Sequence, residues 1–415
     1  MDYLKTDEVA AEWGISPRRL QTLCNEGKIA GAIRFGRAWM IPKGAKKPID
    51  GRRKGAGYQI PTKPDKDMPL PRKSPFLHMT NLYYAPGCAD EAIAALSYNP
   101  EAQKLLAAEI AYSRGDIDQV YHVANYLLEK NSGFYAVLSA GILLAKCAIW
   151  RGDLNMWRKA KIHISEAKAH NDAEIDIVSL SICAVDSILY DVKDFPEWFK
   201  IGSFELLHKD SLPAARVYYA KYMYASAHGL ASKTFQLEGV SGLALMALLP
   251  ATIEPLISHS ICDSTVITEI YLRLTCAVSY HFAGKDKQAI HHIDRALALA
   301  LPDKLFGILA EYCRTISGLL ELRLKVISED AWNEVNRLAK VYLEGWSVLG
   351  SRATGRQIIA KLSKQNREVA RLAAFKLSDA EIAQRMNMSI SGVKQAIRII
   401  KQKSGLERSE FAAII

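Results

Sequence analysis

The chain has 415 residues, a formal net charge of +10 and 49% apolar residues. This length is too great for one hydrophobic core, so several domains are expected, and the apolar share excludes a mainly disordered protein. No run of about 18 uncharged apolar residues indicates a membrane span, and the Met1-Asp2-Tyr3 start is unlike a signal peptide. We expect a soluble, cytoplasmic protein.

The positive charge is concentrated at the two ends of the chain. Residues 1–80 carry +8 and residues 356–415 carry +7, whereas the residues between them carry −5. Lys and Arg near a phosphate backbone release condensed counterions, so both ends are predicted to bind nucleic acid. The seven cysteines form no C-x-x-C pair, which indicates reduced thiols and neither disulfides nor zinc.

The first domain, residues 1–50, begins with a helix-turn-helix pattern. A small residue, Ala10, permits a close helix crossing, and Gly14 suits a turn with positive φ. Ser16 is placed to cap the second helix, with Pro17 in its first turn. The apolar positions of the pattern are Val9, Ala10, Trp13, Ile15, Leu20 and Leu23.

The opposite face of that second helix is predicted to contact double-stranded DNA. Its residues are Ser16, Arg18, Arg19, Gln21, Thr22 and Asn25. Two short apolar runs then flank Gly36-Arg37, a dipeptide typical of a hairpin turn. Such a wing would direct Arg34 and Arg37 toward the DNA backbone, while Trp39 is interpreted as hairpin core.

Residues 51–86 are predicted to be a linker rich in Pro, Lys and Arg. Eight of the fifteen prolines lie between Pro42 and Pro86. Proline fixes φ and removes a backbone donor, so this segment should be semi-rigid and solvated.

Residues 87–350 show helical periodicity interrupted by short turns. The turns are Arg114-Gly115-Asp116, Arg151-Gly152-Asp153, His228-Gly229 and Ala283-Gly284-Lys285-Asp286. Repeated helix pairs of this length predict an α-solenoid that binds a small molecule, a peptide or a protein. We interpret the Arg-Gly-Asp triplets as turns rather than adhesion motifs.

A cluster of aromatic residues is a weak candidate for a ligand or partner groove on these repeats, although a core position is the stronger interpretation. It comprises Trp198, Phe199, Tyr218, Tyr219, Tyr222 and Tyr224. His281, His291 and His292 suggest a metal site, but no Cys or carboxylate completes a tetrahedral set with them, so no metal is predicted. No catalytic or cofactor-binding arrangement stands out, which predicts a protein that is not an enzyme and needs no cofactor.

The helix-turn-helix spacing recurs near the C-terminus, within a domain predicted at residues 356–415. The matching positions are Ile382, Ala383, Met386, Met388, Val393 and Ala396. Asn387 occupies the turn, Ser389 caps the second helix, and Ser378 with Glu381 forms a capping box for the first. The residues predicted to contact DNA are Ser389, Ser391, Lys394, Gln395, Arg398 and Lys401.

Three family resemblances accompany these patterns. Residues 3–48 resemble the excisionase/MerR-like winged helix-turn-helix, through residues 4–10, 14–18 and 27–29 and the Arg34–Arg37 segment. Residues 362–411 resemble the LuxR-type DNA-binding domain, through Leu377-Ser378, Glu381-Ile382-Ala383 and Val393-Lys394 among others. The helical repeats resemble the tetratricopeptide sensor region of MalT-like regulators. The LuxR-type resemblance implies that Lys394 contacts DNA and that the last short helix can mediate a homodimer.

These expectations describe a mainly α bacterial transcription regulator. It would contain a winged helix-turn-helix, a tetratricopeptide-like α-solenoid and a LuxR-type four-helix domain, and an effector on the solenoid would bias DNA binding. Two alternatives remain open: an architectural or recombination-directionality DNA-binding protein, and a repeat scaffold that binds only proteins.

Overall fold

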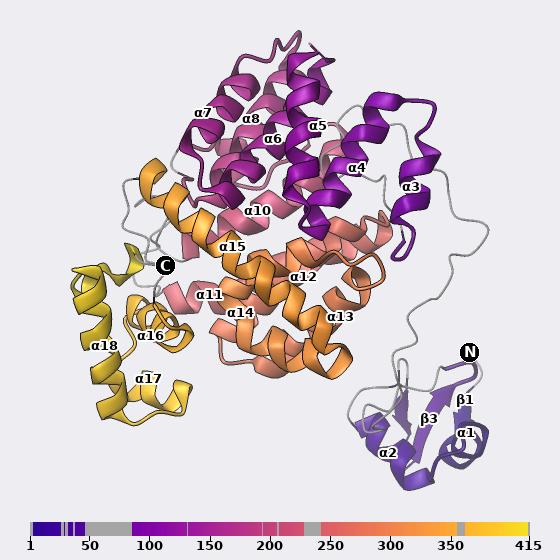
Figure 1. Ribbon diagram of the computed structural model, residues 1–415. Helices are drawn as coiled ribbons and strands as arrows, with labels where there is room; N and C mark the ends of the chain where they lie inside the picture. The colour runs from indigo at the N-terminus through magenta and orange to yellow at the C-terminus, as the bar shows by residue number, and fades with distance from the viewer. Residues whose placement is uncertain are drawn as a thin grey trace. The chain divides into compact units, whose positions relative to one another are not determined.

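The computed structural model describes residues 3–25, 29, 32–35, 38–45, 85–130, 132–192, 194–205, 207–227, 242–354 and 362–413. The chain is mainly α-helical, which confirms the predicted fold class, and it divides into two compact units, Met1–Gln59 and Ile60–Ile415. The first unit combines helices with a small sheet, and the second is helical in its described residues (Figure 1). Most of the predicted linker lies outside the described residues.

The first unit is a helix pair beside a three-stranded sheet. Its elements are β1 (Tyr3–Lys5), α1 (Thr6–Glu12), α2 (Pro17–Asn25), β2 (Ile33–Phe35) and β3 (Ala38–Pro42). The predicted hairpin is confirmed, with Phe35 opposite Ala38, while its turn residues Gly36 and Arg37 lie outside the described part. The pattern did not predict β1, which pairs antiparallel with β3.

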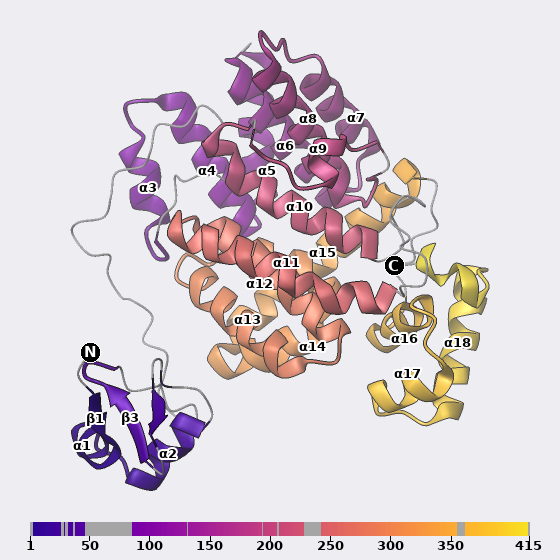
Figure 2. The ribbon, with the colours of Figure 1, turned by 180° about the vertical axis from the view of Figure 1, so that it is seen from behind.

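The second unit is built from consecutive helices (Figures 1 and 2). Its first half contains α3 (Ala89–Ala95), α4 (Pro100–Arg114), α5 (Ile117–Glu129), α6 (Phe134–Arg151), α7 (Leu154–Ser165), α8 (Asp172–Ile188), α9 (Glu197–Lys200), η1 (Lys209–Ser211) and α10 (Leu212–Ala227). Its second half contains α11 (Gly242–Cys262), α12 (Val266–Phe282), α13 (Asp286–Ala300), α14 (Phe306–Ile327) and α15 (Glu329–Thr354). The C-terminal helices are α16 (Lys364–Ala374), α17 (Asp379–Met386), α18 (Ile390–Ser404) and η3 (Arg408–Ala413).

The two Arg-Gly-Asp triplets form inter-helix turns, as predicted. Gly115 and Gly152 end α4 and α6 with φ of +95° and +64°. The side chains of Asp116 and Asp153 then accept N–H bonds from the first turns of α5 and α7. Glycine adopts positive φ without strain and Asp is a preferred N-cap, so each triplet ends one helix and begins the next.

The turn predicted at Ala283-Gly284-Lys285-Asp286 separates two helices. α12 ends at Phe282, α13 begins at Asp286, and the two helices pack against each other. The small residues Ala277, Ala289 and Ala296 are fully buried. Small side chains at these positions allow the two helix backbones to approach closely.

Helices far apart in the sequence also pack together, which a row of repeats touching only their neighbours would not predict. α6 contacts α15, and α4 contacts α14. A Cβ added at Gly345 would lie 2.2 Å from the carbonyl oxygen of Ile149, and one at Gly307 would lie 2.4 Å from that of Tyr112. The two glycines therefore let the late helices rest directly on the backbone of the early ones, and the unit forms one body.

Two described helical segments are long and apolar enough to cross a membrane, namely α6 and Ala244–Cys262 of α11. α6 is 78% buried inside the unit, whereas the α11 segment is 33% buried. The burial of α6 is typical of a core helix, which passes the same test of length and composition as a membrane span.

Candidate nucleic-acid interface

The N-terminal helix pair has the geometry that its spacing predicts. Gly14 has φ of +61°, and the next N–H, from Ile15, returns to the carbonyl of Ala10 at 3.0 Å. Val9, Ala10 and Leu20 are almost completely buried. The apolar pattern therefore forms a small core, and the opposite side of α2 faces outward.

That outward side carries most of the predicted DNA-contacting residues of this module. Arg18, Gln21 and Asn25 are exposed, as is Ser16 just before α2. Thr22 is half-buried, and its hydroxyl donates to the Arg18 carbonyl at 3.0 Å. Arg34 is exposed on β2, opposite the half-buried Trp39. The Arg19 side chain and all of Arg37 lie outside the described residues.

The C-terminal helix pair also has the predicted turn and caps. Asn387 adopts the left-handed conformation (φ 50°, ψ 47°) at the end of α17. Ser378 and Glu381 form the reciprocal capping box, and Ser389 Oγ accepts the Gly392 N–H at 3.0 Å at the start of α18. Because its hydroxyl oxygen caps the helix, Ser389 is primarily a positioning residue here.

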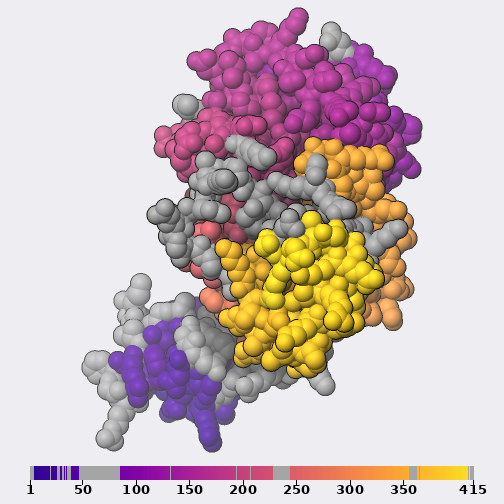
Figure 3. Space-filling view, turned by 90° about the vertical axis from the view of Figure 1, so that its left-hand side faces the viewer, coloured from indigo at the N-terminus to yellow at the C-terminus, as the bar shows by residue number. Residues whose placement is uncertain are grey.

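The exposed face of α18 is cationic and polar. Ser391, Lys394, Gln395 and Arg398 are exposed, as predicted for a surface that contacts DNA. Lys401 differs, because its ammonium group pairs with the carboxylate of Glu407 and its side chain is partly covered. In the space-filling view of Figure 3 the C-terminal helices form a broad outer surface of the second unit.

The C-terminal helices are held on the helical body by contacts that the sequence pattern did not predict. The buried guanidinium of Arg371, on α16, donates to the carbonyl oxygens of Arg314 and Thr315 on α14, both at 3.0 Å. It also pairs with Glu368 at 2.9 Å. An Arg three residues after a Glu is an ordinary surface pattern on a helix, so nothing in the sequence marked this residue.

Two further contacts join the C-terminal helices to α12 of the helical body. The Phe375 ring packs edge-on against Phe282 at a centroid distance of 5.2 Å. Arg385, on α17, donates to the carbonyl of His281 at 2.9 Å. The first two helices of the C-terminal group thus face the body, and the cationic side of α18 is left exposed.

Most of the aromatic cluster forms core, which is the stronger interpretation, and Tyr224 also lines a cavity beside Arg314. Phe199, Tyr218, Tyr222 and Tyr224 are buried. The two remaining residues of the cluster, Trp198 and Tyr219, are half-buried and pack against that core. Aromatic side chains at helical spacing bury large areas, and here they stabilise the packing of α9 and α10.

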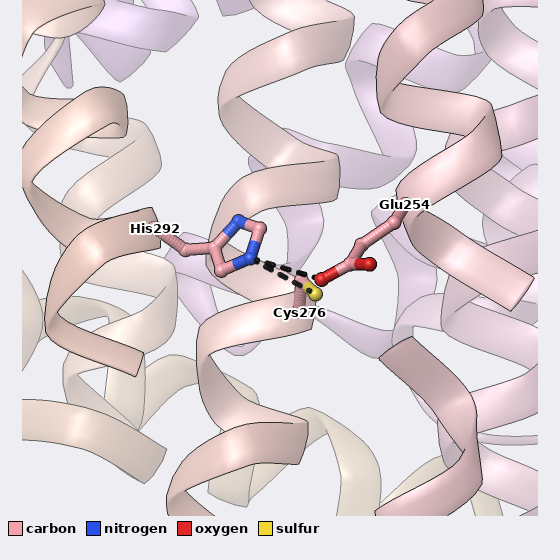
Figure 4. Close-up of side chains that lie close together, drawn as sticks. All are labelled: Glu254, Cys276 and His292. Atoms are coloured by element: carbon pink, nitrogen blue, oxygen red, sulfur yellow. Dashed lines mark hydrogen bonds and ion pairs between the residues drawn. The ribbon is translucent and has the colours of Figure 1, made fainter. Parts of the chain in front are cut away.

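A cluster of possible metal ligands lies between α11, α12 and α13 (Figure 4). His292 Nε2 is 3.6 Å from Cys276 Sγ and 3.6 Å from Glu254 Oε1. The premise that no Cys or carboxylate accompanies these histidines is therefore wrong for His292. Among the described residues His281 instead pairs with Asp286, at 2.8 Å.

Burial sets the protonation of this cluster. Burial raises the pKa of the Cys276 thiol, which keeps it protonated. Burial also lowers the pKa of His292 to about 4, so the imidazole is neutral at pH 7. Glu254 accepts the Tyr280 hydroxyl at 2.6 Å. A cation would have to displace the thiol proton before three ligands were available.

Comparison with known proteins supports one of the two helix pairs. A family model described as a helix-turn-helix domain matches residues 3–45. No curated protein and no solved structure matches the chain. The matched residues run from β1 through β3, and they support a DNA-binding helix-turn-helix in the first unit.

Proposed function

We propose that the chain is a bacterial, cytoplasmic transcription regulator that contacts double-stranded DNA through a helix-turn-helix at each end. The observation that carries this proposal is the pairing of a buried small-and-apolar pattern with an exposed cationic side on both α2 and α18. Arg and Lys on such a helix suit guanine edges or phosphates, and Gln and Asn suit adenine edges.

The helical body between the two modules is proposed to act as a sensor or partner-binding domain, with a tetratricopeptide-like arrangement. The C-terminal module is proposed to be of the LuxR type, and a homodimer through its last helix belongs to the same proposal. The role is binding and regulation, not catalysis. Support comes from consecutive helix pairs and from the capped, exposed α18.

The test is DNA affinity of the full chain across a salt series, by fluorescence anisotropy. Arg18→Ala and Lys394→Ala should each weaken binding and lower the salt slope by about 1 if the residue contacts phosphate. Thermal unfolding should be nearly unchanged, because Arg18 and Lys394 are exposed.

Arg337→Ala is the matched control, because Arg337 is an exposed cation on α15, paired with Glu334. It should leave both affinity and salt slope unchanged. A salt response that is flat for the unaltered chain would instead favour a scaffold that binds only proteins.

A further inference from the structure

A cavity lies between α8, α10, α12, α14 and α15 inside the helical body. Its volume is about 50 Å³. A cavity needs roughly 10–15 Å³ of such volume to hold one water molecule, so this one has room for a few waters or a small oxyanion. The lining residues that matter for its chemistry are Tyr190, Lys221, Glu311, Arg314, Thr315 and Trp346.

The only carboxylate among those six residues is already engaged. Glu311 Oε1 accepts the hydroxyls of Tyr112 and Tyr271, each at 2.7 Å. Its second oxygen lies 3.5 Å from the ammonium of Lys221. One buried acid is therefore balanced by one cation and two hydroxyl donors.

The charge of Arg314 is not compensated by a carboxylate within the described part of the chain. Its guanidinium donates to the Tyr190 hydroxyl and lies 4.2 Å from the centre of a Trp346 ring. Nη1 is buried without a hydrogen-bond partner, and no ion pair with a carboxylate is present among the described residues. Burial lowers the pKa of Arg314 to about 9, and at pH 7 the group is still charged. A buried cation with an unused donor is costly unless something pairs with it.

The turn that ends α8 places Tyr190 beside this cation. Its φ of +57° is the left-handed conformation that commonly follows a helix C-terminus. The rings of Tyr190 and Trp346 form an aromatic wall of the cavity next to Arg314.

The cavity is connected to the C-terminal helices through two residues of α14. Arg314 and Thr315 line the cavity, and their carbonyl oxygens hold Arg371 of α16. α14 departs from helical geometry at the next residue, Ile316 (φ −123°, ψ 26°). A change at this turn of α14 therefore acts both on the cavity and on the two carbonyl groups that hold α16 through Arg371.

We propose that this cavity binds a small oxyanion of a few atoms, of the size of acetate or inorganic phosphate, and that its binding tightens the hold of α14 on Arg371. The anion would pair with Nη1 of Arg314. It would also offset the repulsion between the Arg314 and Arg371 cations. This inference rests on the sensor role proposed above for the helical body, and it names the ligand class and the route of regulation.

The first experiment measures binding to the full chain by calorimetry and thermal shift. The probes are acetate and inorganic phosphate, with acetamide as the neutral counterpart of acetate. At least one of the two anions should bind ten times more tightly than acetamide. Equal binding of acetamide, or no binding of either anion at millimolar concentration, overturns the assignment.

Variants of Arg314 test its role in binding. Arg314→Gln should lower the affinity for the anion at least tenfold, and Arg314→Lys should restore part of that affinity. Arg323→Gln is the control, because Arg323 lies on the same helix and pairs with Asp294 outside the cavity. Unchanged affinity in a folded Arg314→Gln variant, confirmed by circular dichroism, overturns the role of Arg314.

Hydrogen exchange tests the coupling. Bound anion should slow amide exchange in α16 several-fold, and Arg371→Lys should weaken anion binding by a similar factor, because coupling between two sites is reciprocal. Anion binding that leaves α16 exchange unchanged overturns the coupling. None of these measurements uses DNA, so their failure is separable from failure of the DNA-binding proposal.

Discussion

The same helix-pair spacing occurs in two different settings within this chain. In the first unit it closes its own small core, which includes Val9, Leu20 and Ile41. Near the C-terminus the pair shares the core of the helical body and is fixed to it by Arg371. The local pattern thus defines the helix pair, and the residues outside the pattern decide whether the pair stands alone.

This difference has a functional meaning under the proposed function. A module with its own core can bind DNA without reference to the state of the body. A module that is fixed to α14 changes its position or mobility only when its contact with α14 changes. Regulation by an effector is therefore expected to act mainly on the C-terminal module.

The largest expected effect comes from removing the contact between Arg371 and α14. Arg371→Ala leaves Glu368 and two backbone carbonyls without their buried partner, and such losses typically cost ~3–5 kcal/mol. Differential scanning calorimetry should show a lower melting temperature for the helical unit. The melting temperature of the first unit should not change. Arg398→Ala, on the exposed side of α18, is the control and should change stability little.

If Arg371→Ala changed the stability of neither unit, the distinction between a helix pair fixed to the helical body and one with its own core would be wrong. Loss of stability in both units would also contradict it, because the first unit has its own core.

A smaller difference should appear on acidification. His292 has a pKa lowered to about 4 by burial, against about 6.5 in an unfolded chain, so the unfolded state binds more protons between these values. Its contribution is complete above pH 6.5 and falls as pH decreases, by about 2 kcal/mol at pH 5. Residues 1–59 contain no histidine, so the first unit should be nearly insensitive over this range.

The measurement is the free energy of unfolding of each unit between pH 7 and pH 5. His292→Gln should flatten the response of the helical unit. A response that the variant leaves unchanged would mean that other groups carry the acid sensitivity.

The smallest effect concerns the turns. Gly14→Ala meets no neighbouring atom within 4 Å, so its cost comes only from the left-handed backbone, roughly 1–2 kcal/mol. It should lower the melting temperature of the first unit alone. Asn387→Ala is the matching change at the end of α17 and should affect only the helical unit. Equal melting in Gly14→Ala and the unaltered chain would argue against the turn geometry.

Features encoded within a few residues could be predicted from the sequence. The turn at Gly14, the capping box at Ser378 and the Arg-Gly-Asp turns each follow from one or two side chains acting on nearby backbone. The exposed face of α18 follows from the buried face, because the helical period fixes one from the other.

Features that join distant residues could not be predicted. The seat of Arg371, the ligands around His292 and the cavity beside Arg314 each bring together helices whose partners no local pattern specifies. β1 could not be predicted for a different reason, because three residues are too few to show an alternating pattern.

The packing of late helices on early ones sets an order for folding during synthesis. The Tyr112 hydroxyl meets Glu311, a residue 199 positions further along the chain. At ~5–20 residues per second, α4 would wait on the order of 10–40 seconds for α14 to be made. The N-terminal module closes its own core long before then, so the nascent chain carries a finished DNA-binding end while its helical body is still incomplete.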